Sequence, residues 1–78
     1  MKQKLSLQDF VFDALITIRI SANIIVTNGY QINNAKIIAF DNFVILVEAN
    51  NKQTMIYKHA VSSIIPIGKL DISPFLSE

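Results

Sequence analysis

The dipeptide Asn28-Gly29 lies between two apolar stretches and constrains the fold of this chain more than any other feature of its sequence. Asparagine and glycine both tolerate the positive φ angles that a two-residue hairpin turn requires. Before the turn, apolar and polar residues alternate from Ile18 to Val26, as in a half-buried strand, although Ile25 is apolar on the polar face. A second strand begins near Tyr30. The sequence therefore predicts an antiparallel β-hairpin.

The second strand changes phase at Asn33-Asn34. Tyr30 and Ile32 are expected to point inward before this pair, and Ala35, Ile37 and Ala39 after it. A slip of one residue is typical of a β-bulge, which also bends a strand. Turn residues separate three further apolar runs. The predicted turns are Asp41-Asn42 and Asn50-Asn51-Lys52, and the predicted strands are Phe43 to Glu48, Thr54 to Lys58, and Val61 to Ile65, which Pro66 ends.

A helix is predicted over about residues 6–18. Ser6-Leu7-Gln8-Asp9 has the form of a capping box, in which Ser6 accepts hydrogen bonds from first-turn amides and Asp9 lies near the positive end of the helix dipole. The apolar stripe that follows consists of Leu7, Phe10, Val11, Ala14, Leu15 and Ile18. The predicted fold is mainly β with one N-terminal α-helix, and its five strands form a strongly bent antiparallel sheet or small open barrel.

Length and composition exclude several classes of protein. A chain of 78 residues forms one domain and has little room for an enclosed substrate cleft. The net charge is only +1 and no basic tract occurs, so composition alone does not indicate nucleic-acid binding. Without cysteine and with one histidine, the chain has no disulfide scaffold and little to bind a metal with, so no metal or cofactor is expected. No apolar run reaches the length of a signal peptide or membrane span, so we expect a soluble, cytoplasmic protein without a membrane partner.

The fourth and fifth predicted strands are apolar on both faces and would expose unpaired backbone groups if they end the sheet. A ring removes this difficulty, because the fourth strand of one copy can pair with the fifth strand of the next. The turn between these strands contains Tyr57-Lys58-His59-Ala60. Residues 67–78 show no clear period and are expected to form a short, loosely held tail.

Four sequence segments resemble the bacterial Sm-like RNA chaperone family Hfq: SLQD at residues 6–9, VTNGYQI at 26–32, FDNFVILVE at 40–48 and IYKHAVSSIIP at 56–66. The resemblance implies an Sm-like domain over residues 1–66 that assembles as a homohexameric ring. It also implies single-stranded RNA partners, namely small regulatory RNAs and messenger RNAs, and no enzymatic activity. The face that carries the helices, called proximal, takes uridine-rich strands around the pore, and the opposite, distal face takes adenine-rich strands.

The resemblance assigns six residues to the proximal site: Gln8, Asp9, Phe43, Tyr57, Lys58 and His59. Phe43 would stack on bases, and Gln8 and Lys58 would read uracil carbonyls. His59 would hydrogen-bond a ribose or phosphate, while Tyr57 would position the turn. The residues alone leave other interpretations open, because Lys58 can be a solvated cation and Phe43 a core residue. Gln8 and Asp9 can serve helix capping alone.

The distal assignment by position is Ile25, Asn28, Gly29, Tyr30, Gln31, Ile32, Asn33, Thr54 and Ser63. Many relatives have an aromatic residue at Ile25 and a glutamine at Thr54, so adenine binding is expected to be weaker or altered. Many relatives carry an arginine-rich patch near the end of the helix, on the outer rim of the ring. Arg19 is all that remains of this patch here, so the rim departs further from the family. Phe10 also stands where the family usually has a proline.

The predicted function is that of an RNA chaperone and post-transcriptional regulator that promotes pairing of small RNAs with messenger RNAs. The alternative is an Sm-like oligomeric structural or protein-interaction module with reduced RNA-annealing activity, which the depleted rim favours. An enzyme is the weakest interpretation, because a single histidine has no nucleophile, base or metal-ligand set around it.

Overall fold

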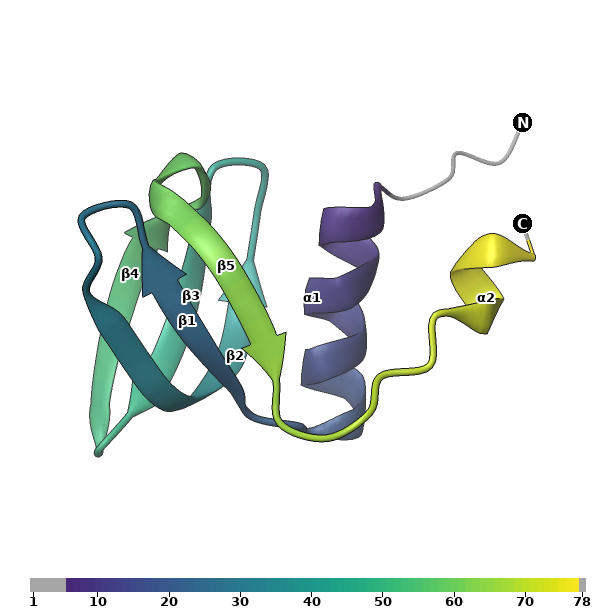
Figure 1. The fold of residues 1–78 in the computed structure, drawn as a ribbon, viewed down its shortest axis with the longest axis horizontal. Coiled ribbons are helices and arrows are strands. Elements are labelled where there is room, and N and C mark those ends of the chain that lie inside the picture. The colour runs from purple at the N-terminus through teal and green to yellow at the C-terminus, as the bar shows by residue number, and fades with distance from the viewer. Residues whose placement is uncertain (1–5, 78) are drawn as a thin grey trace.

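The computed structural model describes residues 6–77, in which a helix precedes a curled antiparallel sheet (Figure 1). The elements are α1 (Leu7–Ile18), β1 (Ala22–Val26), β2 (Gln31–Phe40), β3 (Val44–Ala49), β4 (Lys52–Tyr57), the 3₁₀ turn η1 (Lys58–Ala60), β5 (Val61–Pro66) and α2 (Ser73–Leu76). The predicted helix and five strands are therefore confirmed. The first five residues of the predicted domain 1–66 lie outside the described residues.

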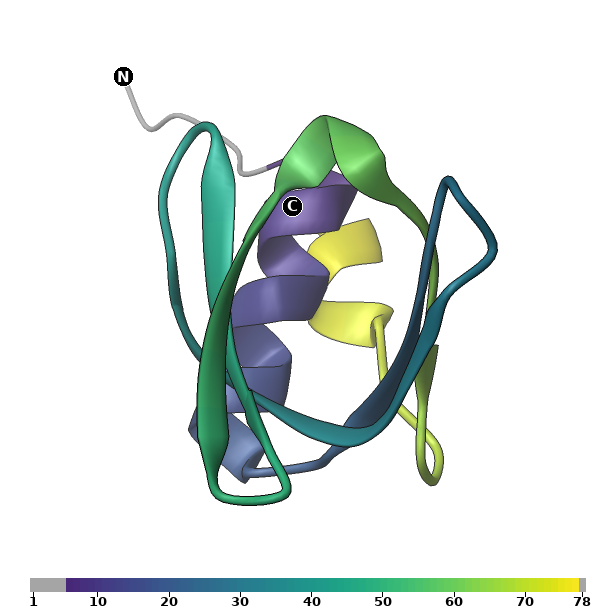
Figure 2. The same cartoon turned by 90° about the vertical axis from the view of Figure 1, so that its left-hand side faces the viewer.

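The strands form one sheet in the order β4-β3-β2-β1-β5, so β4 and β5 are its two edges, as predicted. Figure 2 shows how the sheet curls, with the β1–β5 side facing the β3–β4 side across the core. The long strand β2 belongs to both sides because it pairs with β1 and with β3. Helix α1 packs on β2, where the Phe12 and Phe40 rings lie 5.5 Å apart.

Two bulges bend β2. The first is the predicted one: Ala22 pairs with Ala35 and Ile24 with Ile32, so β2 has an extra residue at Asn33-Asn34. Asn34 has a φ of 55°, and its N–H donates to Asn23 Oδ1 at 3.0 Å.

The second bulge was missed by sequence reasoning. Ile37 pairs with Val47 but Ala39 pairs with Leu46, which leaves Ile38 as an extra residue. The expected inward position of Ala39 is wrong for this reason, since the slip exposes Ala39 and turns Phe40 towards the core.

The Asn28-Gly29 hairpin forms, but its loop has three residues instead of the two predicted. Val26 N–H donates to Tyr30 O at 2.9 Å, and Gly29 is the only residue of this loop with a positive φ, 88°. This is the geometry of a turn followed by a glycine bulge. The two-residue turn is Asn50-Asn51, where φ is 54° and 63°.

The first strand begins later than predicted, whereas α1 ends at Ile18 as expected. α1 continues to Ile18, and Arg19 ends it in the left-handed conformation with its N–H bonded to Leu15 O. β1 therefore begins at Ala22, and the prediction of a strand from Ile18 is wrong. The helical stripe also needs correction, because Phe12 is buried while Leu7 is half-exposed.

The buried core is formed by residues of α1 and the first four strands: Phe12, Leu15, Ala22, Ile24, Ala35, Ile37, Ile45, Val47 and Ile56.

Substitution of Ile45, which is fully buried, by alanine is expected to lower the free energy of unfolding by about 2–5 kcal/mol, because it leaves a cavity. Ile38→Ala, at the exposed bulge, is the control, with an expected loss below about 1 kcal/mol. Urea unfolding measures both, and equal losses would contradict this assignment of the core.

Candidate RNA-binding interface

Ser6 caps the first turn of α1, which leaves the side chains of Gln8 and Asp9 for other contacts. Ser6 Oγ accepts from Asp9 N–H at 3.1 Å, as the capping box predicts. The Asp9 carboxylate accepts from Lys58 Nζ at 2.7 Å. Gln8 is exposed beside it. The capping interpretation therefore applies to Ser6, while Asp9 connects α1 to the turn between β4 and β5.

Lys58 is enclosed to a degree that its sequence context did not indicate. Its side chain is only 9% exposed, and Nζ lies 5.4 Å from the centroid of the Phe12 ring and 5.1 Å from that of Phe40. Two aromatic faces and a carboxylate thus stabilise one ammonium group. The interpretation of Lys58 as a solvated cation is wrong. An ammonium has three donors, and the bond to Asp9 uses one of them.

Phe43 lies in the loop before β3, one residue outside the strand in which it was predicted. Asp41 Oδ1 accepts from the N–H groups of Phe43 at 2.8 Å and Val44 at 2.9 Å, and Lys58 N–H donates to Phe43 O at 2.8 Å. The hydrogen bonds from Phe43 and then Val44 lower the pKa of the Asp41 carboxyl below its usual value, and the charge of Lys58 acts in the same direction. The backbone is fixed, yet the Phe43 side chain is 73% exposed. Phe43 is therefore not a core residue.

These side chains surround one hollow of about 320 Å³, which is lined by Gln8, Asn42, Phe43, Lys58 and His59. Four of the six predicted proximal residues are thus brought together. The other two contact residues that line the hollow. Asp9 binds Lys58, and Tyr57 stacks on His59 with ring centroids 5.7 Å apart. Sequence reasoning missed Asn42, although its place in the turn beside Phe43 was a usable signal.

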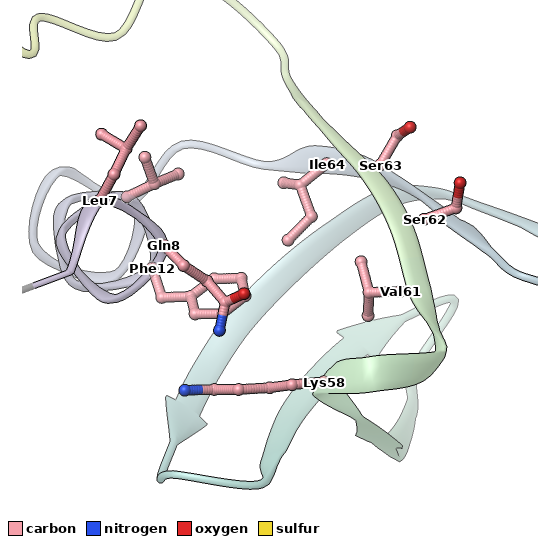
Figure 3. A pocket seen from close by; sticks show the side chains of 9 residues that line it. Leu7, Gln8, Phe12, Lys58, Val61, Ser62, Ser63 and Ile64 are labelled. Carbon is pink, nitrogen blue, oxygen red and sulfur yellow. The ribbon is translucent and has the colours of Figure 1, made fainter.

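An apolar cleft of about 330 Å³ adjoins the hollow between α1 and β5 (Figure 3). Leu7, Val61 and Ile64 are among its lining residues. Figure 3 shows Lys58 extending from the β4–β5 turn beneath Gln8, and these two residues line both cavities. The polar hollow and the apolar cleft therefore share a wall of two hydrogen-bonding side chains.

The residues predicted for the distal face lie in two separate groups within one chain. Eight of them belong to the β1–β2 hairpin and the neighbouring β5: Ile25, Asn28, Gly29, Tyr30, Gln31, Ile32, Asn33 and Ser63. Ile25 pairs with both Gln31 and Ser63. Tyr30 is 66% exposed, so its expected inward position is wrong. Thr54 lies on β4, at the opposite edge of the sheet.

The rim holds little positive charge at the end of α1. Its last turn contains no basic residue, and Arg19 follows as the exposed C-cap.

Within residues 6–77 no helix has the length and apolarity needed to cross a membrane. The same part of the chain contains no group of three histidine, aspartate or glutamate side chains placed to hold a metal ion.

Comparison with known proteins identifies the family. The sequence model described as Hfq protein matches residues 7–71. The chain belongs to the Hfq family. The RNA-binding protein Hfq of Natranaerobius thermophilus is 48% identical over 65 residues, which cover 83% of this chain and 76% of the relative. The RNA-binding protein Hfq of Oceanobacillus iheyensis is 36% identical over 72 residues, which cover 92% and 96%.

A solved structure agrees with this assignment. The crystal structure of the pleiotropic translational regulator Hfq matches with a TM-score of 0.73 and 27% sequence identity, covering 77% of this chain and 98% of that one. The predicted Hfq resemblance and Sm-like fold are confirmed, and this Hfq chain belongs to a family of RNA-binding proteins.

The Asp9–Lys58 pair of this Hfq can be measured by a double-mutant cycle with Asp9→Asn and Lys58→Met. Methionine retains an apolar stem against the Phe12 and Phe40 rings but removes the charge. Because the two groups touch and are partly buried, we expect a coupling of about 0.5–3 kcal/mol in the free energy of urea unfolding. Additive single effects would contradict a stabilising pair.

The Asp41 bonds predict an acid-sensitive loop. Since folding lowers the pKa of Asp41, they stabilise the loop above about pH 4 and are lost as the pH falls further, through the folded-state pKa. We expect the amide proton resonance of Phe43 to move across this range in NMR spectra. Asp41→Asn should abolish that movement, and a Phe43 resonance that titrates unchanged in this variant would contradict the assignment.

Proposed function

We propose that this Hfq chain forms a homohexameric ring in the cytoplasm, binds single-stranded uridine-rich RNA at its proximal pore and adenine-rich RNA at its distal face, and promotes pairing of small RNAs with messenger RNAs. The observation that carries the proposal is the Phe43 ring, which is exposed on a loop with a fixed backbone. The ring lines a hollow with Gln8, Lys58 and His59. A flat exposed surface beside hydrogen-bonding groups suits an unstacked base.

The two sheet edges support the proposed ring. Among residues 6–77, β4 and β5 each have one edge without a strand partner. Exposed apolar side chains lie on both strands: Met55 and Tyr57 on β4, and Ile65 on β5. Pairing β4 of one copy with β5 of the next caps both edges and covers part of this surface. The apolar cleft lies along β5, where the incoming strand would border it.

Assembly gives the β4–β5 turn its proposed role. η1 joins the two strands that would form the ring contacts, so six copies of Lys58 and His59 would gather around the axis.

Stacking on Phe43 is worth about 1–3 kcal/mol per base and tolerates any base. Selection of uracil then falls to Gln8 and the donors of Lys58 that Asp9 does not use. Binding is expected to weaken as salt concentration rises, because salt screens the attraction between RNA phosphates and the Lys58 ammonium group.

The distal face would also be completed by assembly. Within a chain, Thr54 lies at the opposite edge of the sheet from Ile25 and Ser63. The proposed β4–β5 pairing would bring β4 of the next copy, which carries Thr54, alongside the β5 strand that carries Ser63. Tyr30 offers an exposed ring there, but Gln31 Nε2 already donates to Asn33 Oδ1 at 2.7 Å, which reduces the free donors. Adenine binding should accordingly be the weaker of the two.

The alternative function, an Sm-like oligomeric structural or protein-interaction module with reduced RNA-annealing activity, is favoured by the rim. The last turn of α1 has no basic residue, so at this end of the helix an RNA backbone would meet Arg19 and Lys36 of β2, which line one pocket. Annealing of two strands needs both to be held, whereas pore binding needs one. The alternative therefore differs in pairing activity and not in oligo-uridine binding.

Titration of fluorescent oligo-uridine and oligo-adenine, followed by anisotropy, tests the two faces. Phe43→Ala is expected to weaken oligo-uridine binding by about tenfold, from the loss of base stacking, and to leave oligo-adenine binding unchanged. Tyr30→Ala is the matched variant and should show the reverse. Equal losses for both RNAs in either variant would mean that the residue acts through folding or assembly.

Light scattering tests the architecture on the same samples. A particle with six times the mass of one chain is expected. A monomer would contradict the ring, and a ring that binds neither RNA would contradict the proposed function.

A further inference from the structure

The segment after β5 returns to α1 and packs against it. Ile67 N–H donates to Ser21 O at 2.9 Å, which directs the chain back past the start of β1. α2 then places the Phe75 ring on that of Phe10, with centroids 5.4 Å apart and planes inclined by 51°. Figures 1 and 2 both show α2 beside α1, on the side away from the sheet. α1 is therefore held between the sheet and the returning segment.

α2 is too short to be stable by itself. It has four residues, and isolated helices below about 12 residues are marginal in water. Local bonds shape it: Asp71 Oδ1 accepts from Ser73 N–H at 3.0 Å, and Phe75 N–H donates to Ile72 O at 3.0 Å. Phe75 is half-buried while the neighbouring Leu76 is exposed. Among the residues of α2, Phe75 thus makes the anchoring contact to α1.

The anchor is attached at the turn that carries the RNA-site residues. Phe10 follows Gln8 and Asp9 directly, and its N–H makes the first main-chain bond of the helix, to Ser6 O at 2.8 Å. First turns of helices fray, because their amides lack partners within the helix. A ring packed on Phe10 opposes fraying at the position where Gln8 must face the hollow and Asp9 must hold Lys58.

We propose that Phe75 is a positioning residue for the proximal site. Through Phe10 it fixes the first turn of α1, and through that turn the placement of Gln8 and of the Asp9–Lys58 pair. Phe75 does not line the hollow, so it acts without touching RNA. The inference rests on the proposed function for its effect on RNA, whereas its structural step stands separately.

Phe75→Ala, made in the full chain, tests both steps, with Leu76→Ala as the matched control in α2. We expect faster hydrogen exchange at the Phe10 amide and oligo-uridine binding weaker by about threefold to tenfold, as suits the loss of one aromatic pair. Oligo-adenine affinity and particle mass should not change. Phe75→Tyr keeps the ring and should restore both readouts, and Leu76→Ala should match the wild type.

A double variant separates a direct effect from one through Phe10. If Phe75 acts through Phe10, then Phe75→Ala should cause little further loss of oligo-uridine affinity in a Phe10→Ala background. Additive losses would overturn that route. Unchanged exchange and affinity in Phe75→Ala, or equal losses for both RNAs, would overturn the inference. Failure of the wild type to bind oligo-uridine would instead contradict the proposed function, and the exchange comparison would still decide whether Phe75 holds the turn.

Discussion

The ion pair between Lys58 and Asp9 joins the two parts of the molecule on which the candidate site depends. Lys58 belongs to the turn between the edge strands, and Asp9 to the first turn of α1. The pair lies against the Phe12 and Phe40 rings, so the same lysine is tied to the packing of the helix on the sheet. A buried ammonium without these partners would be costly. The position of Lys58 among these partners therefore fixes how the turn, the helix and the hollow lie relative to one another.

Much of the architecture could be predicted from the sequence because local patterns determine it. The Ser6 cap, the hairpin at Asn28-Gly29 and the bulge at Asn33-Asn34 all depend on neighbouring residues. The parity change in β2 was visible because a bulge moves every following side chain to the other face. The apolar faces of the fourth and fifth strands indicated that they need a partner if they end the sheet. The residues grouped as proximal could be named from the family resemblance alone, and four of them line one hollow.

The errors arose where contacts between distant residues decide the outcome, or where a local pattern fits more than one geometry. Phe12 and Phe40 enclose Lys58 only after folding, since the residues are far apart in the sequence. The bulge at Ile38 falls in an apolar run, where alternation gives no signal of a slip. The hairpin loop length could not be read from Asn28-Gly29, since glycine also suits the bulge of a three-residue loop. α2 lacks a helical period because it is held by Phe10 and not by an apolar stripe.

In the proposed function, a lysine fixed by Asp9 and an exposed Phe43 together form a site for uridine at the pore of a ring. A crystal structure of the protein with a short oligo-uridine tests this most directly. We expect a closed ring of six copies with a base stacked on each Phe43 ring, a uracil carbonyl oxygen within hydrogen-bond distance of Gln8 or Lys58, and the Asp9–Lys58 pair retained. RNA bound away from Phe43, or copies joined through surfaces other than β4 and β5, would contradict it.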